Sequence, residues 1–312
     1  MSRVTVVVPL YNKAPYVQRA LRSVLEQTYK YIEVVVIDDG STDGGAEAVA
    51  DFSDSRIRLI RQENAGVSAA RNRGIREASG ELVAFLDADD EWLPDFLATI
   101  EALRETFPRA GLYGTGFRSV YKDGTCKDST LTDEAPMFLI DDYFKRGWSF
   151  LWTGSVAIPR IIFDAVGYFA EGEPAGEDTE MWERIALRFP VAYAAKALAL
   201  YHQEAEGRAC DQNNRSPRYP IFVRTIRQEM SFSQNSPAVG TTVLVYCNHI
   251  LVDYAKRLVI AGLKVEGRRV LRQELFRAPR DCIEVFGILL MSYGVPVSLM
   301  RVFKRILRLF QD

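Results

Sequence analysis

The first hundred residues alternate short apolar runs, rich in Val and Ile, with amphipathic stretches. This alternation is typical of the α/β class, in which a mainly parallel sheet is flanked by helices. Apolar runs predict strands, and apolar residues spaced three or four positions apart predict helices. Strands are expected at residues 4–8, 33–37, 57–60 and 82–86, and helices after Pro15, at residues 43–52 and at residues 68–78.

The pattern from residue 111 to residue 200 is mixed and is most simply the second half of the same domain. Strands are expected near residues 112–121, 155–158 and 192–197, with a helix at residues 178–188. A polar run at residues 204–220 predicts a linker, and the pattern beyond it is helical. We therefore expect an α/β domain at residues 1–215 and a helical C-terminal region at residues 216–312.

Acidic residues follow two of the predicted strands, where open α/β sheets bind ligands. Asp38 and Asp39 end the second strand, and a carboxylate there can accept hydrogen bonds from a base or a ribose. Residues 87–90 follow the fourth strand and include three aspartates. Their mutual repulsion is costly unless a cation lies nearby, and Mn²⁺ or Mg²⁺ bound together with substrate phosphates would supply one. The structural alternatives are an Asx turn at Asp38 and a helix start after residue 90.

Three further positions can carry chemistry. Asp178 follows the glycine-containing loop 172–176 and can act as a general base, or cap a helix. Arg71 follows a glycine turn and can bind a phosphate, or pair with Glu77 on the surface. His202 follows a strand and can complete a divalent metal site, or be structural. The chain has no GxGxxG, GxxxxGK[ST], GxSxG or HExxH motif, so dinucleotide-binding, P-loop, serine hydrolase and zincin functions are not indicated.

Taken in order, five segments resemble the family 2 glycosyltransferases. They are residues 6–12 (VVVPLYN), 37–43 (IDDGSTD), 64–72 (NAGVSAARN), 85–90 (FLDADD) and 177–178 (ED). The resemblance covers residues 3–205 and implies a GT-A fold, with the helical region as a C-terminal extension. It implies inverting transfer of one sugar from a nucleotide-diphospho-sugar to an acceptor hydroxyl, in the synthesis of cell-surface polysaccharide or glycolipid. No QxxRW follows residue 178, which favours single-sugar transfer over processive polymerisation.

The resemblance also assigns roles on the donor side. It implies that Pro9, Tyr11 and Asp39 line the nucleoside pocket, with Asp39 facing the base. It implies that Arg71 and Asp87 contact the donor as well.

The remaining roles concern the metal and the acceptor. The resemblance implies that Asp89 holds Mn²⁺ or Mg²⁺ on the donor diphosphate, with His202 as a further metal ligand. The residues after His202 depart from the family pattern. Asp178 is similar to the general base that removes the proton of the acceptor hydroxyl.

The location of the protein is predicted from its cysteines and apolar segments. Four scattered cysteines without a CxxC pair, at positions 126, 210, 247 and 282, indicate free thiols in a reducing compartment. The N-terminus lacks the apolar segment of a signal peptide, and residues 285–300 are too short and too interrupted by Gly and Pro to span a membrane. A cytoplasmic protein is expected.

The expected partners are a nucleotide-diphospho-sugar donor and a saccharide or lipid-linked saccharide acceptor. Residues up to Gly207 carry a charge of −11 and the rest +9, so nucleic acid is not expected at the acidic half. Residues 296–312 alternate apolar and basic side chains, which predicts an interfacial helix on the cytoplasmic face of the membrane. Packing against the catalytic domain, or against a second copy in a homodimer, explains the same pattern.

Two other functions stay open from the sequence. A sugar nucleotidyltransferase would share the nucleotide-binding sheet and metal-binding carboxylates, but its glycine-rich N-terminal loop is missing here. A non-catalytic sugar-nucleotide-binding scaffold would keep the fold and lose a catalytic carboxylate, and none is visibly lost.

Overall fold

The computed structural model describes residues 3–147, 150–173, 175–205, 217–232, 240–276, 288 and 292–293. The chain divides into two compact units, Met1–Ala209 and Cys210–Asp312. The boundary expected after residue 215 falls within residues 206–216, which lie outside the described residues.

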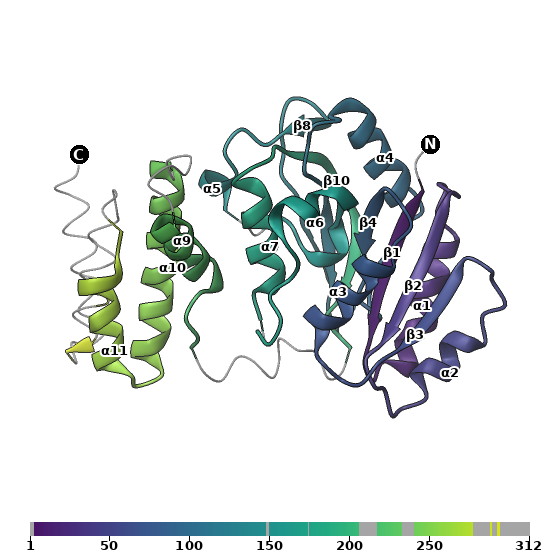
Figure 1. The fold of residues 1–312 in the computed structure, drawn as a ribbon, viewed down its shortest axis with the longest axis horizontal. Helices are drawn as coiled ribbons and strands as arrows, with labels where there is room; N and C mark the ends of the chain where they lie inside the picture. Colours follow the sequence, from purple (N-terminus) through teal and green to yellow (C-terminus); the bar gives the residue numbers. More distant parts are fainter. Residues whose placement is uncertain are drawn as a thin grey trace. The chain divides into compact units, whose positions relative to one another are not determined.

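A mixed sheet of ten strands forms the centre of the first unit (Figure 1). The strands are β1 (Val4–Leu10), β2 (Ile32–Asp38), β3 (Ile57–Arg61), β4 (Leu82–Phe85), β5 (Glu91–Trp92), β6 (Leu112–Val120), β7 (Cys126–Ser129), β8 (Met137–Leu139), β9 (Val156–Pro159) and β10 (Val191–His202). Their order is β3-β2-β1-β4-β9-β6-β10-β5, with β7 paired to β6 and β8 to β10. The first four strands in this order are parallel, and β6 is parallel to β10.

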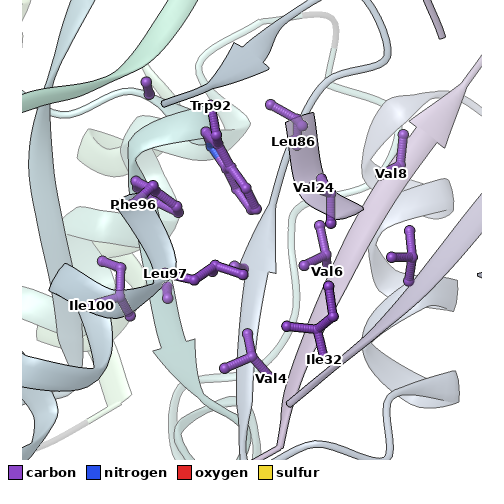
Figure 2. Packing of buried hydrophobic residues seen from close by; sticks show 14 of the residues in the cluster. Val4, Val6, Val8, Val24, Ile32, Leu86, Trp92, Phe96, Leu97 and Ile100 are labelled. Carbon is purple, nitrogen blue, oxygen red and sulfur yellow. The ribbon is translucent and has the colours of Figure 1, made fainter. Parts of the chain in front are cut away.

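Helices cover both faces of this sheet, which confirms the expected α/β class. They are α1 (Ala14–Leu25), α2 (Gly45–Ala50), α3 (Val67–Glu77), α4 (Phe96–Thr106), α5 (Tyr143–Arg146), the 3₁₀ turn η1 (Thr153–Ser155), α6 (Arg160–Val166) and α7 (Glu177–Ala186). Val4, Val6 and Val8 of β1 pack with α1 and α4 in one core (Figure 2), while Val7 faces α3 on the other side. Because β1 is covered on both faces, all of its residues are buried and, apart from Thr5, all are apolar.

The structure adds elements that the apolar pattern did not reveal. β5 has only two residues and pairs antiparallel with β10, and α4 begins four residues later at Phe96. β7 is a polar strand with three exposed residues, so it has no apolar alternation to predict it. Short or fully exposed strands bury too little apolar surface to leave a periodic signal in the sequence.

The C-terminal ends of the central strands meet at one edge of the sheet. Leu10 of β1 lies beside Asp38 of β2, and Val7 lies beside Phe85 of β4. β9 runs antiparallel to both β4 and β6, so β6 and its parallel neighbour β10 end at the same edge as β4. The residues that follow β2, β4 and β10 are therefore brought to a common edge, which we call the ligand edge.

The second unit is helical where it is described. Its elements are α9 (Ile221–Phe232), α10 (Thr241–Ile260), α11 (Lys264–Arg269) and a π-helical turn, η2 (Val270–Glu274). The side chain of Asn248 in α10 accepts a hydrogen bond from the N–H of Phe276 (2.8 Å) and donates one to its carbonyl (3.2 Å). No helix in the described part of the chain is long and apolar enough to cross a bilayer. Residues 296–312, predicted to contact the membrane, lie outside the described residues.

Gly74 of α3 is packed too closely against β1 to accept a methyl group. A Cβ at this position would lie 2.3 Å from Cγ1 of Val7. We expect Gly74→Ala to lower the free energy of unfolding by roughly 1–3 kcal/mol, because the clash outweighs the ~1 kcal/mol that alanine gains over glycine in a helix. Urea denaturation followed by circular dichroism measures the difference.

The control for this prediction is Arg73→Ala on the exposed side of the same helix, which should change the stability by about 0.5 kcal/mol or less. A Gly74→Ala protein more stable than the wild type would show that α3 does not approach β1 as closely as described.

Candidate active site

Asp39 follows β2 at the ligand edge, and three donors hold its carboxylate in place. Oδ1 accepts hydrogen bonds from Gln62 Nε2 (2.8 Å) and the N–H of Ala65 (2.9 Å), and Oδ2 accepts one from the N–H of Gly66 (2.8 Å). The residue is only 3% exposed. A carboxylate has about four acceptor positions, so one is left for an N–H or O–H of a ligand.

Pro9 and Tyr11 lie beside Asp39 at the end of β1. The N–H of Asp39 donates to the carbonyl of Leu10 (2.8 Å), which joins the ends of β1 and β2. Pro9 is buried within β1, whereas the Tyr11 side chain is 51% exposed. The structure thus brings together the three residues expected to line the nucleoside pocket. Their contact with a nucleoside stays a prediction.

Arg71 of α3 is buried and bridges two carboxylates. Its Nη2 donates to Asp87 Oδ1 (2.9 Å) and its Nη1 to Glu177 Oε1 (2.8 Å), while its Nε has no hydrogen-bond partner in the described part of the chain. Burial lowers the pKa of Arg71, but the charges of Asp87, Glu177 and Asp178 outweigh it and raise that pKa above its ordinary value. Arg71 therefore joins the loop after β4 to the start of α7. Both of its terminal nitrogens point to protein carboxylates, and a direct contact with the donor stays a prediction.

Asp89 has a basic partner that the sequence did not suggest. The Nζ of Lys13, in the turn after β1, lies 2.7 Å from Asp89 Oδ2. Since Arg71 neutralises Asp87 in the same way, two of the three aspartates in residues 87–90 have protein cations as partners. The cations expected beside this cluster are thus supplied in part by basic residues distant in the sequence, and the binding of Mn²⁺ or Mg²⁺ stays a prediction.

The third aspartate of the cluster, Asp90, is buried and holds the end of β10. Its Oδ1 accepts a hydrogen bond from the N–H of His202 (2.8 Å). Burial raises the pKa of Asp90 well above its usual range, and the negative charges of Asp89 and Asp87 raise it further. The N–H of His202 and the charge of Arg19 oppose this rise. Asp90 is thus a structural link between the loop after β4 and β10.

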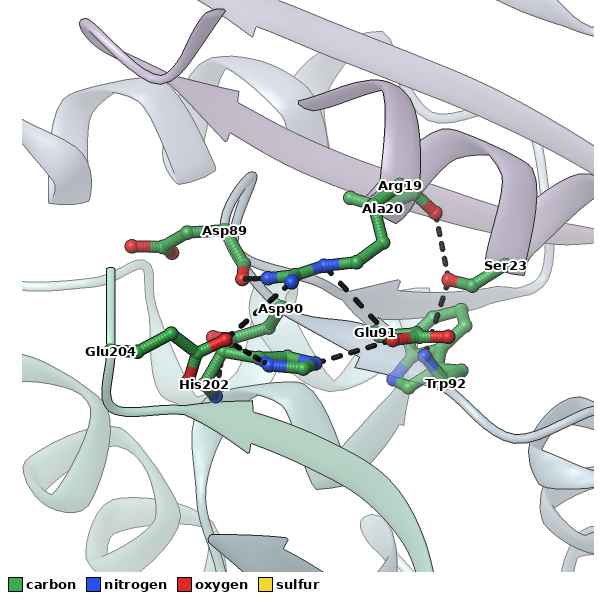
Figure 3. Close-up of polar contacts among 9 residues, drawn as sticks. All are labelled: Arg19, Ala20, Ser23, Asp89, Asp90, Glu91, Trp92, His202 and Glu204. Carbon is green, nitrogen blue, oxygen red and sulfur yellow. Dashed lines mark hydrogen bonds and ion pairs between the residues drawn. The ribbon is translucent and has the colours of Figure 1, made fainter. Parts of the chain in front are cut away.

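His202 lies between two carboxylates (Figure 3). Its Nδ1 is 2.7 Å from Glu204 Oε1, and its Nε2 is 3.2 Å from Glu91 Oε2. Arg19 of α1 lies within ion-pair distance of both glutamates and donates to the carbonyl of Asp89. A metal at His202 would have to replace one of these partners. In the described ranges no group of three or more His, Cys, Asp or Glu side chains is arranged to hold a metal ion. The metal role of His202 and Asp89 stays a prediction.

Asp178 lies in the first turn of α7 and is oriented by two threonines. Its Oδ2 accepts a hydrogen bond from the Thr153 hydroxyl (2.9 Å), and its Oδ1 accepts one from the N–H of Thr179 (2.7 Å). Thr153 is held in turn, because the carbonyl of the next residue, Gly154, accepts a hydrogen bond from Trp92 Nε1 (2.6 Å). Burial raises the pKa of the neighbouring Glu177, Asp178 adds to this rise, and Arg71 opposes it.

Other residues around Asp178 carry no signal in the sequence. Tyr143 is buried, and its hydroxyl has no hydrogen-bond partner among the residues that the structure describes. Burial raises the pKa of Tyr143 well above its ordinary value, and Glu183 and Asp178 contribute to the rise. Thr153 and Tyr143 belong to segments more than twenty residues before Asp178, so only the fold places them beside it.

One cavity among the described residues lies away from this site. It is lined in part by Glu81, Arg104, Pro159 and Arg160. Glu81 directly precedes β4, and Pro159 ends the antiparallel β9, so the cavity lies at the edge opposite the ligand edge. None of the predicted site residues lines it.

The family model described as "Glycosyl transferase family 2" matches residues 5–167, which is more than half of the chain. The chain belongs to this family. The matched range contains every predicted donor residue and Asp89, whereas Asp178 and His202 follow it.

Two curated relatives align with parts of this chain. It is 49% identical over 101 residues to "Glycosyltransferase GlyA" of Streptococcus pneumoniae, covering 32% of this chain and 14% of that protein. It is 36% identical over 197 residues to "Succinoglycan biosynthesis protein ExoW" of Rhizobium meliloti, covering 57% of this chain and 61% of that protein. The chain thus spans less than two thirds of these relatives' lengths.

A solved structure confirms the fold. The chain is similar to residues 1–349 of TarS from S. aureus, solved in complex with UDP-GlcNAc, with a TM-score of 0.65 and 20% identity over 94% of this chain and 82% of that chain. The expected GT-A type of α/β fold is therefore confirmed.

The raised pKa of Asp90 predicts a dependence of stability on pH. The folded chain keeps the Asp90 proton to a higher pH than the unfolded chain, whose aspartates titrate near pH 3.9. Above that pH the folded state binds more protons than the unfolded state at this position, so Asp90 makes the stability fall as the pH rises. We expect Asp90→Asn, which stays uncharged, to gain stability relative to the wild type between pH 4 and pH 7.

Urea denaturation of both proteins at several pH values measures this effect. Asp123→Asn is the control, because hydrogen bonds from Thr125 lower the pKa of this exposed carboxyl, so this variant should not gain stability relative to the wild type as the pH rises. If the free energy of unfolding of Asp90→Asn changed with pH in parallel with that of the wild type, the raised pKa of Asp90 would be contradicted.

Proposed function

We propose that this family 2 glycosyltransferase moves one sugar from a nucleotide-diphospho-sugar to an acceptor hydroxyl, with inversion at the anomeric carbon. The observation that carries the proposal is the oriented carboxylate of Asp178, with one oxygen bonded to Thr153 and the other to Thr179. A base that is already oriented can remove the acceptor proton as the new glycosidic bond forms. Direct displacement needs no covalent intermediate on the enzyme.

The donor side of the proposal rests on Asp39. Its carboxylate is held rigid by three internal hydrogen bonds and has one acceptor position left. This position suits an N–H of a base or a ribose hydroxyl. The exposed Tyr11 ring beside it can pack against a nucleoside. The TarS structure with UDP-GlcNAc supports the same class of donor for this chain.

Mn²⁺ or Mg²⁺ is part of the proposal, with Asp89 as its protein ligand. The position fits a cation, because the ammonium group of Lys13 lies 2.7 Å from Asp89 Oδ2. A divalent cation held by few protein ligands can complete its coordination with oxygens of the substrate diphosphate. Such an ion would neutralise the leaving diphosphate. His202 would be a further ligand only if Glu91 or Glu204 gave way.

The product and the place of action are proposed from the relatives. ExoW is named as a succinoglycan biosynthesis protein, which supports a saccharide or lipid-linked acceptor in polysaccharide or glycolipid synthesis. We further propose that the protein is cytoplasmic and that residues 296–312 contact the anionic face of the membrane. The alternative for these residues is packing against a second copy in a homodimer. The family match disfavours the sugar nucleotidyltransferase and the non-catalytic scaffold.

Asp178→Asn tests the assignment of the base. We expect the rate of sugar transfer to fall by about 10²- to 10⁴-fold, because the amide cannot accept the acceptor proton, while donor binding remains. Release of nucleoside diphosphate in the presence of acceptor measures transfer, and a thermal shift with a panel of nucleotide sugars measures binding. Asp164→Asn, at an exposed carboxylate of α6, should keep the wild-type rate. A wild-type rate in Asp178→Asn would refute the assigned base.

Asp89→Asn tests the assignment of the metal. We expect Mn²⁺ no longer to strengthen donor binding, since the amide oxygen carries no net charge to hold the cation. Calorimetric titration of the donor with and without Mn²⁺ measures it, and Asp95→Asn in the turn before α4 is the matched control. Equal, metal-dependent binding in Asp89→Asn and Asp95→Asn would remove Asp89 from the metal site.

A further inference from the structure

Lys13 and Asp89 form a largely buried ion pair for which the proposed reaction has no use. The ammonium group lies 2.7 Å from Asp89 Oδ2, and the two side chains are 12% and 13% exposed. Asp89 is also the residue to which the proposed function assigns the divalent cation. One carboxylate therefore has two candidate counterions, one from the protein and one from solution.

The backbone is shaped to direct Lys13 to this position. The preceding residue, Asn12, has a φ of 51°, in the left-handed region that residues other than glycine rarely adopt. The loop after β2 holds it there, because Asn12 Oδ1 accepts a hydrogen bond from the N–H of Thr42 (2.9 Å) and its own N–H donates to Ser41 Oγ (3.1 Å). The turn that carries Lys13 is thus tied to the loop that carries Asp39.

The basic side chains of this cluster differ in the geometry of their cationic groups. Arg71 is bonded to two carboxylates on different elements, and Arg19 lies between Glu91 and Glu204. Lys13 carries a single ammonium group on a flexible four-carbon side chain, which can reorient without breaking a bidentate arrangement. Lys13 is therefore the cation of the cluster best suited to exchange.

A divalent cation and the Lys13 ammonium cannot both lie against Asp89. Like charges a few ångströms apart repel strongly where water is largely excluded. The Asp89 carboxylate therefore binds either the divalent cation or the ammonium group, unless a second anion binds nearby and pairs with one of them. The diphosphate of a nucleotide brings such an anion to the same place.

We propose that Lys13 is an exchangeable counterion of Asp89, which a divalent cation must displace, and that the displaced ammonium group then pairs with the donor diphosphate. The inference rests on the proposed function, from which it takes the cation and the diphosphate. Metal alone then binds weakly, and metal and nucleotide strengthen each other's binding, because the nucleotide gives the displaced lysine a new partner. Lys13 acts on the reaction as a positioning residue.

The test is the affinity for Mn²⁺ alone, measured by isothermal titration calorimetry without nucleotide. We expect Lys13→Gln to bind Mn²⁺ roughly ten-fold more tightly than the wild type, because no ammonium group has to leave Asp89. Lys13→Arg keeps the charge and should bind as weakly as the wild type. Lys30→Gln removes an exposed lysine just before β2, at the opposite edge, and should leave the affinity unchanged. Thermal unfolding checks that each variant is folded.

A second measurement separates exchange from a general effect of charge. With saturating UDP, wild-type Mn²⁺ affinity should rise by a larger factor than in Lys13→Gln, since only the wild type has a lysine to transfer to the phosphates. A charge that stays in place would shift the Mn²⁺ affinity equally with and without UDP, so equal factors in the two proteins would overturn the proposal. Equal Mn²⁺ affinity of Lys13→Gln and the wild type without nucleotide would also overturn it.

The proposed function can fail separately. Sugar transfer that proceeds at full rate in EDTA, with no Mn²⁺ bound by any variant, would overturn the exchange and leave the transferase assignment standing. Absence of transfer with every donor and acceptor, together with the tighter Mn²⁺ binding of Lys13→Gln, would leave the exchange standing and overturn the transferase assignment.

Discussion

The buried guanidinium of Arg71 is the contact on which the rest of the site depends. It joins the loop after β4 to the first turn of α7, two segments about ninety residues apart, through Asp87 and Glu177. Removing one partner of such a buried arrangement leaves an uncompensated charge and typically costs about 3–5 kcal/mol. Because Asp178 directly follows Glu177, the same contact sets where the candidate base lies relative to the aspartates after β4. The residues proposed for the donor and for the acceptor are thus linked by one side chain.

The acidic character of the ligand edge is balanced from within. Lys13 pairs with Asp89 and Arg71 with Asp87, while a raised pKa lowers the charge of Asp90. An uncompensated cluster of carboxylates would resist folding, whereas a neutralised one is stable before any ligand arrives. Under the proposed function, a metal and a diphosphate would bind here by replacing these ion pairs.

Much of the fold was predictable because its central strands are buried on both faces. The apolar runs at β1, β2, β3 and β4 predicted strands within a few residues of the observed bounds, and the helices between them followed from their amphipathic spacing. β5 and β7 were not predicted, because two-residue or exposed strands leave no periodic pattern. The ligand edge itself was predictable, since parallel strands direct their C-terminal ends the same way.

By itself the sequence determined the α/β class, the family and the acidic residues after β2 and β4, because these follow from local apolar patterns and from motifs contiguous in the chain. The tertiary structure alone decided which side chains these residues meet. Lys13 at Asp89, Thr153 at Asp178 and Glu177 at Arg71 are pairs separated by 25 to 106 positions. Local patterns carry no information on such pairs, since the order of the strands and the φ of single turn residues bring them together.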